Sequence, residues 1–240
     1  MQRIVKTNPI YSPFYQDESR ILVFHGGAGS GKSVFVSAKI MRRACFERPH
    51  KILVIRKVAS TLKDSVYAEL STRIDEFGMS KHIHPNKTDK TFTFDNGNMI
   101  ICKGLDEPEK IKSIEGITSV WIEEATELNE NDFDQLMLRV RGEKANYIQF
   151  ILSFNPIDEN HWIKRRLIDT KEATVLHTTY KDNKFLDEQY IKTLNDLEHT
   201  NSLYYQIYCL GEWGVVDTSN KFLYSFDQSK HVKRFNVLLI

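Results

Sequence analysis

Short apolar runs of strand length alternate with helically spaced segments along most of this chain. The apolar runs fall at residues 20–25, 51–56, 117–122, 147–153 and 173–179. Helical spacing recurs between and after them, at residues 34–46, 60–77, 131–140, 158–168, 187–197 and 201–209. This alternation predicts an α/β fold with a central, mostly parallel sheet and helices on both of its faces.

Two segments depart from this alternation. Residues 92–102 place Asn96-Gly97 between two apolar stretches, and this dipeptide suits the type I′ turn of an antiparallel hairpin. From Asp217 onward the periodicity fades. We therefore expect one folded domain over residues 1–216 and a linker or tail over residues 217–240.

Composition narrows the class of protein without identifying it. The chain has 240 residues, of which 41% are hydrophobic, enough for one sizeable core. Its 33 Lys and Arg residues nearly balance 32 Asp and Glu, so any nucleic-acid contact must come from local patches. No apolar run approaches the length of a membrane span, and the N-terminus has no apolar signal-peptide segment. We therefore expect a chain that does not enter a membrane.

Two smaller groups of reactive side chains point to no chemistry of their own. Cys45, Cys102 and Cys209 are odd in number and far apart, which indicates reduced and mostly buried thiols. His82 and His84 form a close pair without carboxylate or cysteine companions at ligand spacing. A solvated loop is expected there rather than a metal site.

A glycine-rich segment after the first apolar run carries the clearest chemical signal. It fits the pattern G-x-x-x-x-G-K-[ST], the phosphate-binding P-loop, and reads Gly26-Gly27-Ala28-Gly29-Ser30-Gly31-Lys32-Ser33. The segment lies between a strand and a helix, as that motif requires. Glycines let backbone N–H groups turn inward at an electropositive helix start. Lys32 would reach the β- and γ-phosphates of a nucleotide, and the Ser33 hydroxyl would hold Mg²⁺.

A pair of acids forms the second motif. The apolar run 117–122 delivers Glu123 and Glu124 at its C-terminal end, where open α/β sheets bind their ligands. Next to a nucleotide, Glu123 would orient Mg²⁺ through its water shell. Glu124 would polarise the water that attacks the γ-phosphate. Away from a P-loop, such a pair is usually a solvated surface feature.

The order of these parts favours one class of P-loop protein. A strand–helix unit and a hairpin lie between the P-loop and the acidic pair. An additional strand between the two motifs and a catalytic glutamate are similar to the RecA-like (ASCE) division of P-loop ATPases. A helicase or other nucleic-acid remodelling ATPase stays open as an alternative, and so does a nucleotide-driven switch. Glu124 argues against the switch, which gains nothing from a built-in base.

Several further segments, in order along the chain, resemble the large terminase subunit of tailed bacteriophages. They are residues 113–127, 138–142, 153–156, 178–183 and 210–214, and the resemblance covers about residues 10–226. It implies an ATPase motor that uses ATP and Mg²⁺ to move double-stranded DNA into a procapsid. The implied partners are the portal protein, the small terminase subunit and further copies of the chain in a ring, commonly a pentamer. The implied location is the host cytoplasm, transiently at the portal vertex.

The resemblance also assigns roles within the strand after the acidic pair. Ser153 and Asn155 lie at its end, where the family has its coupling motif. A hydrogen bond from either residue to the γ-phosphate would be lost on hydrolysis. The alternative is a plain strand-ending turn, because Asn-Pro terminates strands. The P-loop, Glu123 and Glu124 match the family's nucleotide, metal and catalytic-base positions.

The resemblance is incomplete in one respect, which is the residue that would supply a positive charge to the transition state. Many terminases carry an arginine inside the P-loop, at the position that Ala28 occupies here. Arg139, Arg141, Lys112 and Arg56 remain as candidates, each of which is also consistent with a salt bridge or a solvated charge. An arginine finger is worth roughly 10³–10⁵ in rate. Our preferred hypothesis is that a ring neighbour supplies Arg139 or Arg141.

Other expected contacts are less defined. Tyr11, Phe14 and Gln16 precede the first strand, where they would form an adenine pocket or merely pack the N-terminal segment. Residues 180–183 follow another strand end without an assignable role. The basic residues in segments 164–166 or 81–90 would bind DNA phosphates. The alternative for both patches is that their charges simply face solvent.

A nuclease activity is not expected from this chain. Large terminases normally carry a second, RNase H-like domain whose separated carboxylates hold two metal ions. After Trp213 the chain offers Asp217 and Asp227 as its only acids. We therefore predict an ATP hydrolase without a DNA-cutting centre.

Overall fold

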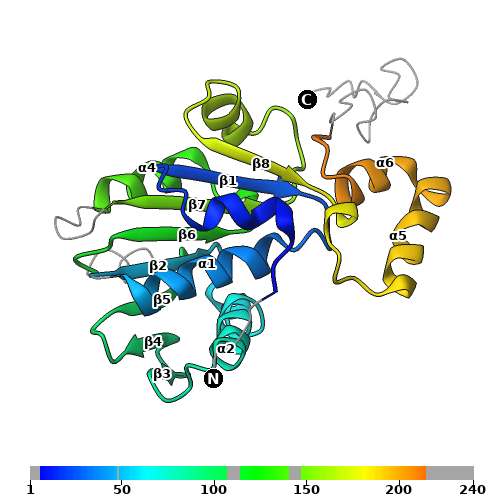
Figure 1. Cartoon of the computed structure of the whole chain (residues 1–240). Coiled ribbons are helices and arrows are strands. Elements are labelled where there is room, and N and C mark those ends of the chain that lie inside the picture. The colour runs from blue at the N-terminus through cyan, green and yellow to red at the C-terminus, as the bar shows by residue number, and fades with distance from the viewer. Residues whose placement is uncertain (1–5, 48, 107–113, 141–146, 215–240) are drawn as a thin grey trace, which may run out of the picture.

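An eight-stranded sheet with helices on both faces forms the centre of the structure (Figure 1). The structure is a computed structural model that describes residues 6–47, 49–106, 114–140 and 147–214. Within it, the strands follow the spatial order β3-β4-β5-β2-β6-β7-β1-β8. The predicted α/β class with a mostly parallel sheet is confirmed.

Six strands of the sheet run parallel to one another. They are β5 (Met99–Gly104), β2 (Lys51–Arg56), β6 (Ser119–Glu123), β7 (Gln149–Phe154), β1 (Ile21–Gly26) and β8 (Thr174–Thr178). The buried strands β1, β6 and β7 lie side by side, with β7 in the middle. The carboxyl ends of these three strands therefore meet at one edge of the sheet.

One edge of the sheet is antiparallel. β4 (Thr91–Phe94) pairs with β5 through the predicted hairpin, in which Gly97 takes a φ of 87°. β3 (Ile83–Asn86) then pairs with β4 at the outer edge. The prediction of a loop at His82 and His84 was therefore wrong in part, because His84 belongs to β3. Both imidazoles hydrogen-bond Asp95, at 2.9 and 2.8 Å. Within the described residues, however, no group of side chains could hold a metal ion.

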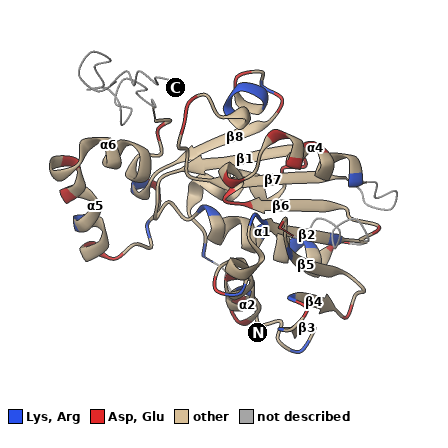
Figure 2. Cartoon of the chain, turned by 180° about the vertical axis from the view of Figure 1, so that it is seen from behind, with Lys and Arg blue, Asp and Glu red and all other residues tan. Residues whose placement is uncertain are grey.

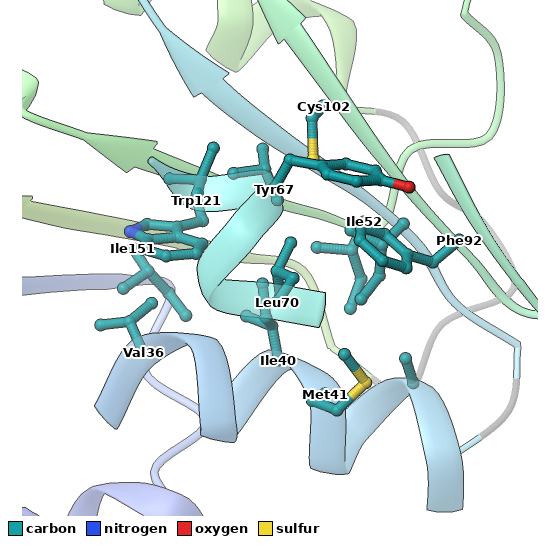
Figure 3. Close-up of a cluster of buried hydrophobic side chains, with 14 of the residues drawn as sticks. Val36, Ile40, Met41, Ile52, Tyr67, Leu70, Phe92, Cys102, Trp121 and Ile151 are labelled. Atoms are coloured by element: carbon teal, nitrogen blue, oxygen red, sulfur yellow. The ribbon is translucent and has the colours of Figure 1, made fainter. Parts of the chain in front are cut away.

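The helices that cover one face are α1 (Lys32–Phe46), α2 (Val66–Phe77) and the 3₁₀ helix η1 (Pro9–Tyr15), with η2 (Ala59–Leu62) leading into α2. Alternate residues of the strands point toward them, since side chains along a strand alternate between faces. Figure 3 shows this cluster, in which Val36 and Ile40 of α1 pack near Ile151 and Leu70. Trp121 of β6 is fully buried in the same cluster.

The opposite face carries α4 (Glu130–Arg139), the π-helical turn η4 (Lys164–Ile168) and the 3₁₀ turn η3 (Ala125–Glu127). Phe133 of α4 and Leu167 of η4 are buried against the other set of strand side chains. Charged residues lie mainly on the helices and loops around the sheet (Figure 2). The sheet thus has two apolar layers, one on each face.

A small helical unit lies beside the end of β8. It contains η5 (Tyr180–Asp182), α5 (Glu188–Thr200), α6 (Ser202–Tyr204) and the π-helical turn η6 (Tyr205–Cys209). Tyr180, Leu194, Tyr205 and Cys209 form its own apolar cluster. We call residues 180–209 the C-terminal helical unit.

The remaining expectations concern the ends of the chain and its thiols. Cys102 and Cys209 are buried, Cys45 is half-buried, and all three are free thiols. In the part of the chain that the structure describes, no helix is long and apolar enough to span a bilayer. The predicted tail over residues 217–240 lies outside the described residues, so the domain boundary stays a prediction.

Candidate nucleotide site

The predicted site residues meet at the carboxyl edge of β1, β7 and β6. β1 leads into the glycine-rich loop, β6 ends at Glu123, and Asn155 follows β7. Because β7 lies between the other two strands, its end separates the loop from the acidic pair. Around these ends lies a cavity of about 430 Å³, lined by residues 28–34 together with Glu123, Glu124, Ser153, Phe154, Asn155, Asn183 and Leu186.

The loop depends on glycine at positions where no other residue fits. Gly31 is the N-cap of α1 and has a φ of 87°, a left-handed conformation that suits glycine. A Cβ on Gly27 would lie 1.9 Å from the Cys209 carbonyl oxygen, so the C-terminal helical unit packs directly on the loop backbone. The Ala28 N–H also donates to the Tyr208 carbonyl, at 2.6 Å.

Lys32 lies inside the curve of the loop. Its Nζ donates to the carbonyl oxygens of Gly26 and Gly27, at 2.9 and 2.8 Å. It also donates to Ser30 Oγ at 3.1 Å and to Asn155 Oδ1 at 2.9 Å. Burial lowers the pKa of this ammonium group to about 8, against the opposing effect of the two glutamates. The first residue of α1 therefore places a buried cation beside the cavity.

Glu123 is held by hydroxyl groups from both sides. Ser33 Oγ donates to Oε1 at 2.6 Å, and Ser153 Oγ donates to Oε2. The Trp121 indole in turn donates to Ser153 Oγ at 2.7 Å. Burial raises the pKa of Glu123 to about 7, although both serine hydrogen bonds act in the opposite direction. A chain of hydrogen bonds thus links the P-loop serine to the middle strand.

Glu124 has an unusual backbone for a residue other than glycine. Its φ of 54° and ψ of 51° are left-handed, and such conformations cluster at functional sites. Glu124 belongs to the lining of the cavity. Burial raises the pKa of Glu124, and Arg56, the last residue of β2, opposes this rise most strongly. Arg56 also pairs with Glu127, at 3.2 Å.

The structure therefore brings most of the predicted site together. Residues 28–33 of the phosphate-binding loop, both glutamates, Ser153 and Asn155 line one cavity, whereas Gly26 and Gly27 do not belong to its lining. Arg139 does not belong to its lining. It is the last residue of α4, the helix that follows the acidic pair and lies over one face of the sheet (Figure 1). Arg141 and Lys112 lie outside the described residues.

The oxygen ligands at the cavity suit Mg²⁺. The Ser33 hydroxyl and the Glu123 carboxylate face each other there, and Mg²⁺ prefers hard oxygen ligands supplied by one or two protein groups plus phosphates. When bound, the ion would neutralise charge on the phosphates. Ser33 and Glu123 are the residues that would hold it.

A second cavity of about 260 Å³ adjoins the first. Gly31, Val34 and Asn183 line both, and the second is also lined by Asn8, Tyr11, Tyr15, Arg73 and Phe185. Of the three residues expected near an adenine, Tyr11 lines this cavity but is 1% exposed and stacks on Phe35. Phe14 packs edge-on against Phe24, and Gln16 is exposed, so neither lines it.

Asn183 and Leu186 are cavity residues that sequence reasoning did not identify. Asn183 follows a strand end within the segment 178–183 that contributed to the family resemblance. Its place after a strand end was the one feature of the sequence that could have indicated Asn183 as a cavity residue. Leu186 offered no comparable signal, because a single leucine before a helix carries no chemistry.

Comparison with known proteins decides the family. The family model described as phage terminase large subunit matches residues 18–212. The chain belongs to this family. Among curated terminases, the PBSX phage large subunit of Bacillus subtilis (strain 168) is 32% identical over 211 residues, which are 79% of this chain and 48% of the relative. The large subunit of Bacillus phage SPP1 is 29% identical over 214 residues, 82% and 50% of the two chains. This terminase chain thus spans about half the length of the curated relatives it matches.

Solved terminase structures share the fold. The large terminase of a thermophilic bacteriophage, in complex with ADP, superposes with a TM-score of 0.70 at 20% identity, over 94% of this chain and 57% of that one. The large terminase of bacteriophage HK97 gives a TM-score of 0.69 at 8% identity, over 87% and 51% of the two chains. These likenesses establish the RecA-like fold of this terminase chain.

Proposed function

We propose that this chain is the ATPase motor of a phage terminase, which hydrolyses ATP to move double-stranded DNA into the procapsid. One observation carries the proposal. The glycine-rich loop, Lys32 and the two glutamates line a single cavity of about 430 Å³ at the carboxyl edge of the sheet. Membership in the terminase family supports the DNA-packaging context.

The residues around the cavity can divide the chemistry of hydrolysis. Backbone N–H groups at the start of α1 would bind the phosphates, and Lys32 would exchange its present carbonyl partners for phosphate oxygens. Ser33 and Glu123 would hold Mg²⁺. Glu124, which lines the cavity, would accept a proton from the attacking water. The pKa of Glu124 is raised, and a raised pKa suits a general base better than the pKa of an ordinary surface glutamate does.

The hydrogen bonds at the end of the middle strand, β7, can change when the γ-phosphate is bound or lost. Asn155 Oδ1 now accepts from Lys32, and Ser153 donates to Glu123. If Lys32 turns to a phosphate, Asn155 loses that partner. Each catalytic cycle would then change the hydrogen bonds at the end of β7, which is the coupling role expected for Ser153 and Asn155.

The second cavity supports a purine nucleotide as substrate. Tyr15 and Phe185 offer aromatic surfaces there, and Arg73, which also lines the cavity, pairs with Glu69 and Glu76. Because the second cavity adjoins the first through Gly31 and Val34, a nucleotide with its phosphates in the loop can reach it with its base. We infer from the family that the base is adenine.

A ring of identical chains, commonly a pentamer, would complete the site. Arg139 does not line the cavity of its own chain, which supports a role on the phosphate of a neighbouring subunit. We propose that Arg139 or Arg141 of that neighbour stabilises the transition state. Isolated monomers would then turn over ATP slowly, and the rate would rise with protein concentration.

DNA, the portal protein and the small terminase subunit are the proposed partners, in the host cytoplasm and transiently at the portal vertex. Of the two basic patches, residues 164–166 are largely neutralised, since Lys164 pairs with Asp169 and Arg166 with Asp134. Figure 2 shows acidic residues beside this turn. Among the described residues, no salt bridge engages Lys81, Lys87 or Lys90. The segment 81–90 is therefore the better candidate for DNA phosphates.

The test is ATP hydrolysis in the presence of Mg²⁺, with and without procapsids that carry the portal. We expect hydrolysis by the unaltered chain and a higher rate with procapsids. Lys32→Ala should abolish turnover, whereas Lys184→Ala, which removes an exposed lysine near the cavity, should preserve it. A chain that binds ATP but hydrolyses none with procapsids present would contradict the motor and favour a nucleotide switch.

A further inference from the structure

Two side chains from distant parts of the chain hydrogen-bond backbone carbonyl groups of the phosphate-binding loop. Asn183 Nδ2 donates to the Gly29 carbonyl at 2.7 Å. The Tyr11 hydroxyl donates to the Ser30 carbonyl at 3.0 Å. The two bonds therefore fix the carbonyls of two consecutive peptide groups in the loop, one bond for each carbonyl.

Neither side chain is free to move. The Tyr11 ring is 1% exposed and stacks on Phe35 with 4.7 Å between ring centroids, and its hydroxyl also meets Thr178 Oγ1 at 3.0 Å. Burial raises the pKa of Tyr11 to about 12, so the phenol keeps the proton that it donates.

Asn183 is anchored with comparable rigidity. It is the C-cap residue that follows the 3₁₀ turn η5, which a capping box between Thr179 and Asp182 stabilises. Its Oδ1 accepts from Asn8 Nδ2 at 2.9 Å and from the Phe185 N–H at 3.1 Å. Only a side-chain amide at this position combines these acceptances with the donation to Gly29, because a carboxylate has no hydrogen to donate.

The consequence follows from the geometry of the peptide group. In a trans peptide the carbonyl of one residue and the N–H of the next point in opposite directions. A carbonyl that is held by a fixed donor therefore also fixes the direction of the following N–H. We propose that Asn183 and Tyr11 are positioning residues that orient the Ser30 and Gly31 N–H groups toward the phosphates of the bound nucleotide. This inference rests on the proposed function and assigns two residues to its phosphate-binding step.

The two bonds preorganise the loop before the nucleotide arrives. Without them, each peptide group must be oriented by the phosphates themselves, which lowers affinity. The loss of one such hydrogen bond corresponds to about a three- to tenfold weaker binding. The effect should concern the polyphosphate and not the base, because both bonds end on the loop backbone.

The experiment measures the affinities of ATP and of inorganic tripolyphosphate, both with Mg²⁺, by displacement of a fluorescent ADP. The variants are Asn183→Ala and Tyr11→Phe, the second of which keeps the buried ring. Tyr180→Phe is the matched control. It removes another buried hydroxyl, which bonds Asn195 at 2.5 Å and Tyr205 at 3.1 Å instead of the loop.

We expect Asn183→Ala and Tyr11→Phe each to weaken both ligands about three- to tenfold, and Tyr180→Phe to change neither by more than about twofold. Equal affinities in all chains, or a lower melting temperature without a change in affinity, would overturn the inference. A loss for ATP but not for tripolyphosphate would also overturn it, because the contact would then serve the base. An unaltered chain that binds neither ligand would instead refute the proposed function, and this inference with it.

Discussion

His25 should make the stability of this protein depend on pH in a way that one substitution removes. The residue belongs to β1, is 8% exposed, and lies among aromatic rings. The ring centroids of His177, Trp213 and Phe154 are 5.0, 5.8 and 5.9 Å from its own. Burial, followed by the charges of His177 and Lys32, lowers the pKa of His25 from 6.5 to about 3.

The sign and size of the effect follow from these two pKa values. Between pH 6.5 and 3 the unfolded chain binds a proton at His25 that the folded chain does not, so stability falls as the pH falls. The contribution is intact above pH 6.5 and is lost at about 1.4 kcal/mol per pH unit below it. At pH 5 the loss reaches about 2 kcal/mol.

Urea denaturation at pH 7.5 and pH 5 measures this effect when the unaltered chain is compared with His25→Phe. The substitution keeps a flat ring in the stack but removes the titrating group. The free energy of unfolding should decrease by about 2 kcal/mol more in the unaltered chain than in the variant. Histidines that do not contact His25 are present in both proteins, so their contributions cancel. The same pH dependence in both would refute the buried, neutral state of His25.

Three further predictions concern stability and the fit of the loop. Ser153→Ala leaves the buried Trp121 indole N–H without its acceptor, so urea denaturation should show a loss of about 1–3 kcal/mol. Arg43→Ala removes a fully buried guanidinium with several polar partners, and should cost about 3–5 kcal/mol in the same assay. Gly27→Ala forces a Cβ toward the Cys209 carbonyl, so nucleotide titration should show at least about tenfold weaker ATP binding together with a lower melting temperature.

The parts of this protein that sequence reasoning could predict are those with a local signature. The phosphate-binding loop needs glycine at fixed spacing between a strand and a helix, so its eight residues identify it without knowledge of the fold. The acidic pair is equally local, because an apolar strand that ends in two carboxylates indicates a ligand edge. The parallel sheet followed from the alternation of apolar runs with helical spacing.

The features that could not be predicted depend on contacts between distant segments. Asn183 lies 154 positions from Gly29, whose carbonyl it binds. Neither local sequence predicts this hydrogen bond. The edge strand β3 contains Pro85 and exposed polar residues, a composition that resembles a loop, and only its pairing with β4 makes it a strand. The absence of Arg139 from the cavity lining likewise depends on how α4 packs on the sheet, which its own residues do not specify.

The central claim is that Glu124 activates the water that attacks ATP bound in the glycine-rich loop. The most direct measurement is phosphate release in a single turnover with Mg²⁺, with the chain in saturating excess over ATP, for the unaltered chain, Glu124→Gln and the control Glu127→Gln. Glu124→Gln should bind ATP with unchanged affinity and release phosphate at least about 100-fold more slowly, the range typical for loss of a general base. Glu127→Gln should release it at nearly the normal rate. Equal rates for Glu124→Gln and the unaltered chain would contradict the account.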